Sequence, residues 1–134
     1  MKKKMMTLMA ATILTLTMGQ NVFAGTSVDF YEFTINNSGN YVYGEFFTNN
    51  NSTPSISGWQ DGACNNNTLV EYALVKKGIL GDTKYAGPTA IPYDRITNWY
   101  TQQWYSVNTN TQMQIRIQNK ADSCSTSGAG NVYN

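Results

Sequence analysis

Two tryptophan–tyrosine pairs within ten residues are the side chains best suited to bind a ligand. The stretch NWYTQQWYSV, residues 98–107, carries Trp99-Tyr100 and Trp104-Tyr105 in surroundings rich in Asn and Thr. Flat aromatic rings that face solvent stack on sugar rings, and they also make apolar contacts with protein partners. The same rings pack well in a core, so their orientation decides whether they bind anything.

If this stretch forms a strand, its side chains alternate between two faces. Trp99 and Tyr105 then share one face, and Tyr100 and Trp104 share the other. Only one of these pairs faces solvent, where Trp59 is a further candidate. Two structural interpretations leave neither pair free: a proline-containing loop covers the outer face, or the stretch forms a helical turn that stacks Tyr100 on Trp104. We favour a purely structural role for the four rings. Contact with a partner or the cell envelope comes second, and sugar binding comes third.

The sequence contains few residues suited to catalysis or metal binding. The chain has no histidine, which excludes Ser-His-Asp and Cys-His sites and removes the commonest nitrogen ligand of zinc. Two of the three glutamates Glu32, Glu45 and Glu71 facing one cleft would suit sugar hydrolysis, but solvent-facing charges on an open sheet explain them more simply. DGACNNN, residues 61–67, offers calcium a single carboxylate, and we interpret it as a turn. We predict no catalytic residue, no metal and no cofactor.

The N-terminal residues predict export. Residues 2–4 are lysines, residues 5–18 form an apolar stretch too short to span a bilayer comfortably, and residues 22–24 offer a small-residue cleavage site. We predict a cleaved signal peptide at 1–24 and a single secreted domain at 25–134, either extracellular or attached to the cell envelope. The short, lysine-rich signal is typical of bacteria.

Removal of the predicted signal changes the charge of the chain. It takes away three of the nine basic residues and leaves six against eight acidic ones, so the formal charge moves from +1 to −2. Nucleic acid and anionic membrane surfaces attract clustered Lys and Arg, and we expect neither as a partner. In an exported chain, Cys64 and Cys124 predict one disulfide bond. Such a bond would stabilise the fold by about 4 kcal/mol through the unfolded chain.

Alternating strand patterns dominate the secreted part, and helical periodicity is hard to find there. VDFYEFTIN, residues 28–36, and YVYGEFF, residues 41–47, flank an SGN turn and predict a hairpin. ISGWQ, residues 56–60, is a short strand that carries Trp59. TLVEYALVKK, residues 68–77, is the most continuously apolar stretch, which is typical of a central strand covered on both faces.

The C-terminal half continues in the same way. Residues 83–94 contain two prolines, which cannot donate ladder hydrogen bonds, and they predict an edge or irregular strand. In QMQIRIQ, residues 112–118, the apolar side chains alternate and point inward. We interpret residues 119–131 as a loop before a last short strand at 132–133. About seven short strands predict an antiparallel sandwich or small barrel, and we take the fold class to be an all-β sandwich.

Several short motifs along the chain carry a family resemblance. They are the lysine-led signal, an aromatic F-x-I opening strand, N-W-Y…W-Y, the alternating MQIRIQN and a short Gly-rich end. This layout resembles small uncharacterised exported proteins of Bacillus-type Gram-positive bacteria, although the cysteine pair departs from it. Those proteins have no established activity, so the resemblance implies a secreted β-fold and adds no catalytic residue. Lactococcin-type bacteriocins are a more distant comparison.

These observations predict a secreted or envelope-associated protein that acts by binding and not by catalysis. Its partner would be an extracellular protein or a cell-wall polysaccharide. Two alternatives stay open: a carbohydrate-binding module that uses exposed Trp and Tyr, and a secreted bacteriocin or toxin-like protein. The candidate binding aromatics are Trp59, Trp99, Tyr100, Trp104 and Tyr105.

Overall fold

The computed structural model describes residues 25–63, 69–92, 99–121 and 124–134, which form nine β-strands and no helix. The predicted signal peptide at 1–24 lies outside the described residues. Within the described part, no helix is long and apolar enough to cross a membrane. The strands are β1 (Ser27–Ile35), β2 (Tyr41–Tyr43), β3 (Phe47–Asn49), β4 (Ser55–Gly62), β5 (Leu69–Lys76), β6 (Thr83–Pro92), β7 (Tyr100–Gln103), β8 (Thr111–Asn119) and β9 (Thr126–Tyr133).

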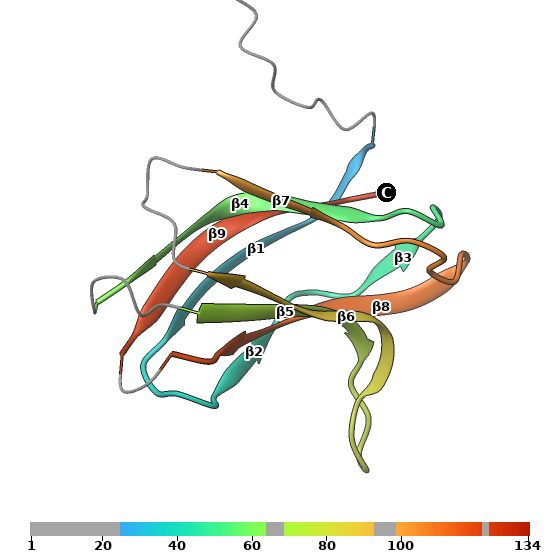
Figure 1. The fold of residues 1–134 in the computed structure, drawn as a ribbon. Coiled ribbons are helices and arrows are strands. Elements are labelled where there is room, and N and C mark those ends of the chain that lie inside the picture. The colour runs from blue at the N-terminus through green and yellow to red at the C-terminus, as the bar shows by residue number, and fades with distance from the viewer. Residues whose placement is uncertain (1–24, 64–68, 93–98, 122–123) are drawn as a thin grey trace, which may run out of the picture.

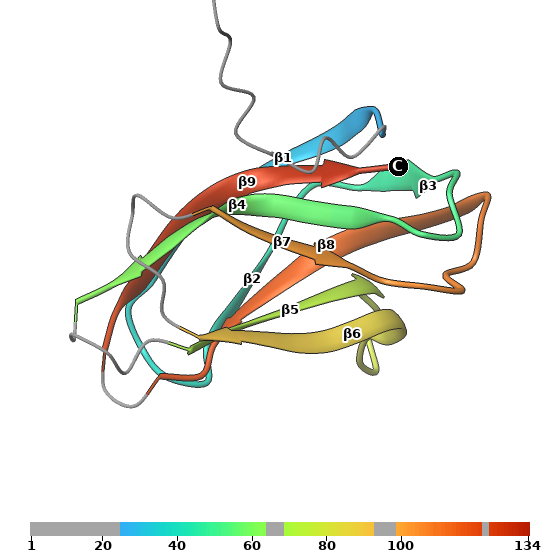
Figure 2. The ribbon, with the colours of Figure 1, turned by 45° about the horizontal axis from the view of Figure 1, so that its top comes forward.

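The strands form two antiparallel sheets that face each other (Figures 1 and 2). The first sheet has the order β1-β9-β4-β7. The second sheet has the order β2-β8-β5-β6, and β3 pairs with β8 as well. This architecture confirms the predicted all-β sandwich, with nine strands where about seven were expected, because β2 and β3 are three-residue strands that a pattern of alternation does not separate.

A central strand was predicted for the residues of β5 and an edge strand for those of β6, and both predictions are confirmed. β5 lies between β8 and β6, and the four consecutive residues from Tyr72 to Val75 are at most 1% exposed. β6, which carries Pro88 and Pro92, lies at the edge of the second sheet. An edge position suits proline because one side of the strand needs no ladder donor.

The predicted hairpin of residues 28–36 and 41–47 is wrong. β1 pairs with β9 in the first sheet, whereas β2 pairs with β8 in the second sheet. Residues 36–40 therefore cross from one sheet to the other. The alternation in β1 was interpreted correctly, since its apolar side chains are buried, but alternation indicates which face is buried and not which strand is the neighbour.

The Gly-rich end is also a strand, where a loop was predicted up to residue 131. β9 lies between β1 and β4 and pairs with both along its whole length. Gly128 and Gly130 face the core, and a Cβ atom on them would collide with the rings of Phe33 and Tyr31. Glycine here makes room for large neighbours, and such positions are easily mistaken for a loop.

The core fills the space between the two sheets. In β8 the side chains of Met113, Ile115 and Ile117 are buried, as predicted. Gln114, expected to point outward to solvent, is only 7% exposed, and its amide donates a hydrogen bond of 3.0 Å to the carbonyl of Gly44. The apolar core consists of Tyr31, Phe33, Ile35, Phe47, Ile56, Val70, Tyr72, Leu74, Tyr100, Trp104, Val107, Met113, Ile115, Ile117 and Val132.

Candidate functional site

The four aromatic residues of 98–107 divide into a buried pair and an exposed pair. Tyr100 and Trp104 are buried, at 8% and 6% exposure, while Trp99 and Tyr105 are 62% and 72% exposed. The alternation argued from the sequence therefore separates them correctly, although the strand itself is only four residues long. Neither structural interpretation that covered both faces describes this region.

The inner pair belongs to the core. The Tyr100 hydroxyl donates to the Tyr72 hydroxyl at 2.7 Å, and the Tyr72 hydroxyl donates to Oε1 of Gln60 at 2.9 Å. The Tyr31 hydroxyl lies 2.7 Å from that of Tyr100. Because Tyr100 gives its single proton to Tyr72, Tyr31 must be the donor to Tyr100. The Gln60 amide ends the chain by donating to the carbonyls of residues 91 and 92 in β6.

This chain of hydroxyls connects the two sheets through an apolar interior. Burial raises the pKa of Tyr31 and of Tyr72 well above the ordinary value, and it raises the pKa of Tyr100 in the same direction. All three hydroxyls thus stay protonated and can act as donors, which a buried chain of this kind requires. We assign this chain of hydrogen bonds a structural role, since the residues that form it are at most 8% exposed.

Trp104 also holds the sheets together. Its indole N–H donates to Oγ1 of Thr89 in β6 at 3.0 Å, and its backbone N–H donates to the carbonyl of Pro54 at 3.0 Å. Of the five candidate binding aromatics, Tyr100 and Trp104 are therefore not accessible to a ligand.

Trp59 and Trp99 are left together on the outward side of the first sheet. The pairing of β4 with β7 ends at Gly58 opposite Tyr100. Trp59 and Trp99 are the next residue of each segment beyond this last pair, which is why we place them side by side. Trp59 is partly exposed and pairs with Ala129 of β9, which in turn pairs with Glu32 of β1. One row across the sheet thus contains two indoles, a methyl group and a carboxylate.

The next row on this side carries one aromatic ring and three polar side chains. Phe30, Asn131, Ser57 and Thr101 follow one another across the four strands, and the Thr101 hydroxyl donates to that of Ser57 at 3.3 Å. Phe30 is 61% exposed. We call these two rows the outer face of the first sheet: Phe30, Glu32, Ser57, Trp59, Trp99, Thr101, Ala129 and Asn131. The residues next to the two tryptophans in these rows, Ser57, Thr101 and Ala129, are small, so they do not cover the rings.

Tyr105 lies beyond the end of β7. Its hydroxyl donates to Oε1 of Gln103 at 3.2 Å, in an exposed position. It is accessible to a partner, but it is not part of the row that holds Trp59 and Trp99.

The glutamates do not form a pair in one cleft. Glu32 is exposed on the first sheet, Glu45 is exposed between β2 and β3, and Glu71 lies on the second sheet, 3.9 Å from Arg116. Asp29 is the carboxylate that lies near Glu45: partial burial, opposed by the backbone hydrogen bond at Phe30 and aided by Glu45, raises the pKa of Asp29.

The predicted metal and disulfide features fall partly outside the described residues. Residues 65–67 of the Asn cluster lie there, and among the described residues no group of three potential acidic, Cys or His ligands comes together. Cys64 also lies outside them, and Cys124 is buried at 3% exposure. The Cys64–Cys124 disulfide stays a prediction.

The second sheet carries a charged cluster that the sequence did not reveal. Asp82 accepts a hydrogen bond of 2.9 Å from the Tyr43 hydroxyl and forms an ion pair of 3.1 Å with Arg116. Lys77 lies 4.8 Å from the centre of the Tyr43 ring. Desolvation and the hydrogen bond to Asp82 raise the pKa of Tyr43 to about 12. Only the sheet pairing brings these residues together, because they come from β2, β8 and the loop before β6.

Two hollows lie along the edge formed by β1 and β2. The larger, about 460 Å³, is lined by residues 34–37 and 40–42, and the smaller, about 170 Å³, is lined by residues that include Tyr31, Tyr43, Glu45 and Ile117. Neither contains a tryptophan. The accessible indoles lie on the outer face of the first sheet instead.

No protein-family model matches the chain, and neither a curated protein nor a solved structure matches it significantly. The arguments about its function therefore rest on the residues themselves.

Proposed function

We propose that this is an exported, non-catalytic binding protein, and that the outer face of the first sheet binds an extended polysaccharide of the cell wall. One observation carries this proposal: Trp99 is 62% exposed, and it directly precedes Tyr100, whose partner Gly58 directly precedes the partly exposed Trp59 in β4. Burying such rings against a ligand recovers apolar area that the fold leaves in water.

The neighbouring groups support a sugar as the ligand. A row of two indoles offers a strip for the apolar faces of successive sugar rings. Glu32, Asn131, Ser57 and Thr101 supply carboxylate, amide and hydroxyl groups beside the strip, and such groups satisfy the hydroxyls at the rim of each ring. Both described hollows lie along β1 and β2. An open sheet face accepts a long chain that passes across it, whereas a small molecule is usually enclosed.

Export and the disulfide complete the proposal. The lysine-led residues 1–24 support a signal peptide, and an oxidising exterior supports a Cys64–Cys124 bond. A Gram-positive host is supported only by the resemblance of the chain to small exported proteins of such bacteria.

Tryptophan fluorescence tests the proposed ligand. On titration with soluble cell-wall polysaccharide, the emission of the protein should change and saturate, and Trp99→Ala should weaken binding about tenfold or more, as for an anchor residue. Trp99 is exposed, so the variant should keep its stability within about 0.5 kcal/mol. Tyr41→Ala is a matched control, since Tyr41 is a 52% exposed aromatic on the second sheet, and it should bind as the wild type does.

Equal binding by the wild type and Trp99→Ala would exclude the outer face as the site. If no polysaccharide binds and the protein instead co-purifies with one surface protein through Trp99, the ligand is a protein. Inhibition of related strains by the added protein would favour the toxin-like alternative.

A further inference from the structure

The turn between β5 and β6 carries two large aliphatic side chains at its tip. The N–H of Gly81 donates to the carbonyl of Gly78 at 3.4 Å, which places Ile79 and Leu80 at the two central positions of the turn. Both residues are fully exposed, at 103% each. Turn geometry favours Gly, Asn, Asp, Ser or Pro at such positions, so the backbone gives no reason for Ile and Leu.

The tip also makes no contribution to the core. Figure 1 shows the turn between β5 and β6 extending beyond the second sheet, away from the rest of the fold. Single exposed aliphatic residues are common on protein surfaces. Two adjacent ones at the end of a protruding hairpin are different, because they can enter another apolar phase together without moving the rest of the fold.

Basic residues surround the base of this hairpin. Lys76 and Lys77 lie at the end of β5, and Lys84 lies in β6 opposite Val75. The one acidic residue in the loop, Asp82, forms an ion pair with Arg116 at 3.1 Å. The lysines therefore leave the base of the hairpin positively charged, although the secreted part as a whole carries −2.

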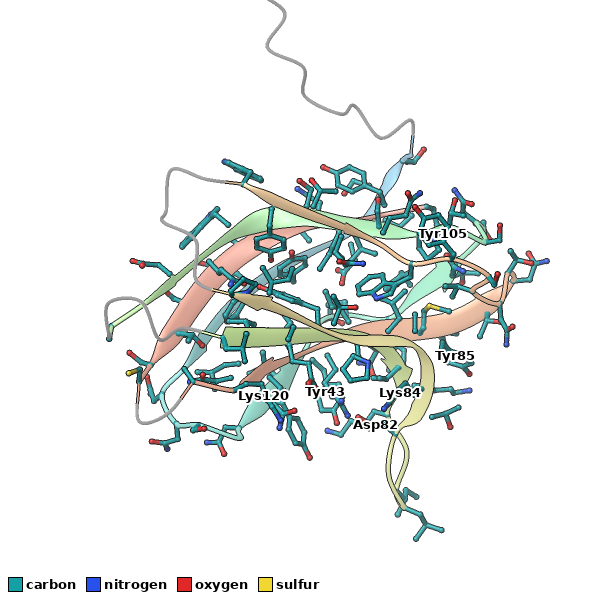
Figure 3. The ribbon with its side chains drawn as sticks, viewed as in Figure 1. Tyr43, Asp82, Lys84, Tyr85, Tyr105 and Lys120 are labelled. Carbon is teal, nitrogen blue, oxygen red and sulfur yellow. The ribbon has the colours of Figure 1, made fainter. Side chains whose placement is uncertain are left out.

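Tyrosines lie at the same level as the lysines. Figure 3 shows Tyr43, Asp82, Lys84 and Tyr85 around the base of the hairpin. Lys77 lies over the ring of Tyr43 at 4.8 Å, and Tyr43 packs edge-on against Tyr41 at 5.5 Å between ring centres. Tyrosine and lysine are the residues that gather at the headgroup level of a bilayer, because each combines an apolar body with a polar end.

We propose that the hairpin tip inserts into an anionic lipid surface, with Ile79 and Leu80 among the acyl chains and the lysines at the headgroups. This order from tip to base is that of interfacial membrane-binding segments. A second copy of the chain fits less well, since two tips that meet would bring like charges together. A pocket on another protein would accept the tip but would leave the lysines and tyrosines at its base without a role. The proposal is independent of sugar binding, which uses the opposite sheet.

The net charge of residues 25–134 predicted that no anionic membrane surface is a partner. The charge around the hairpin differs from this net charge because the charged residues are unevenly distributed. Glu32 and Asp61 lie on the first sheet, away from this hairpin. Glu71 and Asp82 lie on the hairpin itself, but both form ion pairs with Arg116, which leaves the three lysines in excess. Association should therefore be weak, salt-dependent and oriented.

Vesicle binding by the full chain tests the proposal. In a sedimentation assay with phosphatidylcholine–phosphatidylglycerol vesicles, the double variant Ile79→Ser/Leu80→Ser should show a several-fold lower bound fraction than the wild type. Both proteins contain residues 1–24, so the difference reports the tip. The variant should keep its unfolding midpoint, because neither side chain packs against the fold. The matched control Phe30→Ser, an exposed apolar residue on the first sheet, should bind as the wild type does.

A reporter at the tip gives a second measurement. The emission of Leu80→Trp should move to shorter wavelength on adding anionic vesicles, and this shift should be smaller with pure phosphatidylcholine or in high salt. An unmoved emission, or equal vesicle binding by the wild type and the double serine variant, would overturn the proposal. Capture of a protein partner through the tip without any vesicle binding would overturn it as well.

Discussion

The hydroxyl of Tyr100 occupies the middle of the buried hydrogen-bond chain. It accepts from Tyr31 and donates to Tyr72, each at 2.7 Å. These bonds hold β1 and β7 of the first sheet against β5 of the second, with Gln60 of β4 at the end of the chain. This hydroxyl makes one hydrogen bond to Tyr31 and one to Tyr72, so its removal would break both.

Tyr100→Phe should therefore lower the free energy of unfolding by about 1–2 kcal/mol, because the Tyr31 hydroxyl loses its acceptor inside the core. Urea unfolding followed by fluorescence measures this. The matched variant Tyr105→Phe removes an exposed hydroxyl and should change the free energy by less than about 0.5 kcal/mol. Equal effects in the two variants would show that the buried chain contributes nothing beyond an ordinary surface contact.

Single residues were predicted best where one physical rule decides their position. Strand alternation separated Trp99 and Tyr105 from Tyr100 and Trp104, and the structure agrees. The sequence alone did not indicate which pair was outside. That depends on which side the second sheet covers, and the answer comes from contacts such as Trp104 with Thr89 of β6.

At the scale of elements, β9 shows how glycine positions a neighbouring strand. Tyr31 lies over Gly130, and Phe33 lies over Gly128, so the rings of β1 rest on the backbone of β9. The same absence of a side chain at Gly58 in β4 leaves room for the Tyr31 hydroxyl. The position of the hydroxyl chain thus depends on glycines in two strands.

Gly130→Ala should destabilise the protein by about 1–3 kcal/mol, because the added methyl group meets both the Ser57 carbonyl of β4 and the Tyr31 side chain and overpacks the core. Thermal unfolding should show the lower midpoint. Ala129→Ser, at the adjacent outward position, is the control and should leave the midpoint nearly unchanged. A Gly130→Ala variant as stable as the wild type would mean that Tyr31 can move away without loss.

Elements were predictable from the sequence to different degrees. Strands with continuous apolar or alternating patterns, such as β5 and β8, were located within one or two residues. Pairing was not, since β1 and β2 look like a hairpin locally but join different sheets. The glycines of β9 were interpreted as a loop because the rings that require them, Phe33 and Tyr31, lie in β1. In the register of β1 with β9, each ring is 95 or more residues away from its glycine along the sequence. The clustering of Arg116, Asp82 and Tyr43 was hidden for the same reason.

At the scale of the whole molecule, the sandwich separates two surfaces. The accessible tryptophans lie on the outer side of the first sheet, and the apolar hairpin tip extends from the second. A protein held at a lipid surface by the tip would keep the tryptophans on a different side of the molecule. The hydrogen-bonded tyrosines between the sheets hold the two sheets together. Their contribution to the stability of the fold depends on pH.

Alkaline pH should weaken the whole fold through this core. The pKa values of Tyr31, Tyr72 and Tyr100 are raised by burial, whereas an unfolded tyrosine titrates near pH 10. Above that pH the folded state keeps protons that the unfolded state loses, so the free energy of unfolding is unaffected below about pH 10 and falls as pH rises further. Each buried tyrosine contributes a slope of about 1.4 kcal/mol per pH unit, and the three together contribute about 4.

Urea unfolding between pH 8 and pH 11 measures this slope. Tyr100→Phe should reduce the slope above pH 10 by about one quarter, because the pKa of Tyr43 is raised as well and three such tyrosines remain where the wild type has four. Ile56→Val is the control: it removes one methyl group from the same core and should lower the free energy by about 1 kcal/mol at every pH, with the wild-type slope. If Tyr100→Phe and Ile56→Val share one slope, the buried hydroxyls do not control the alkaline transition, and another group must be responsible for it.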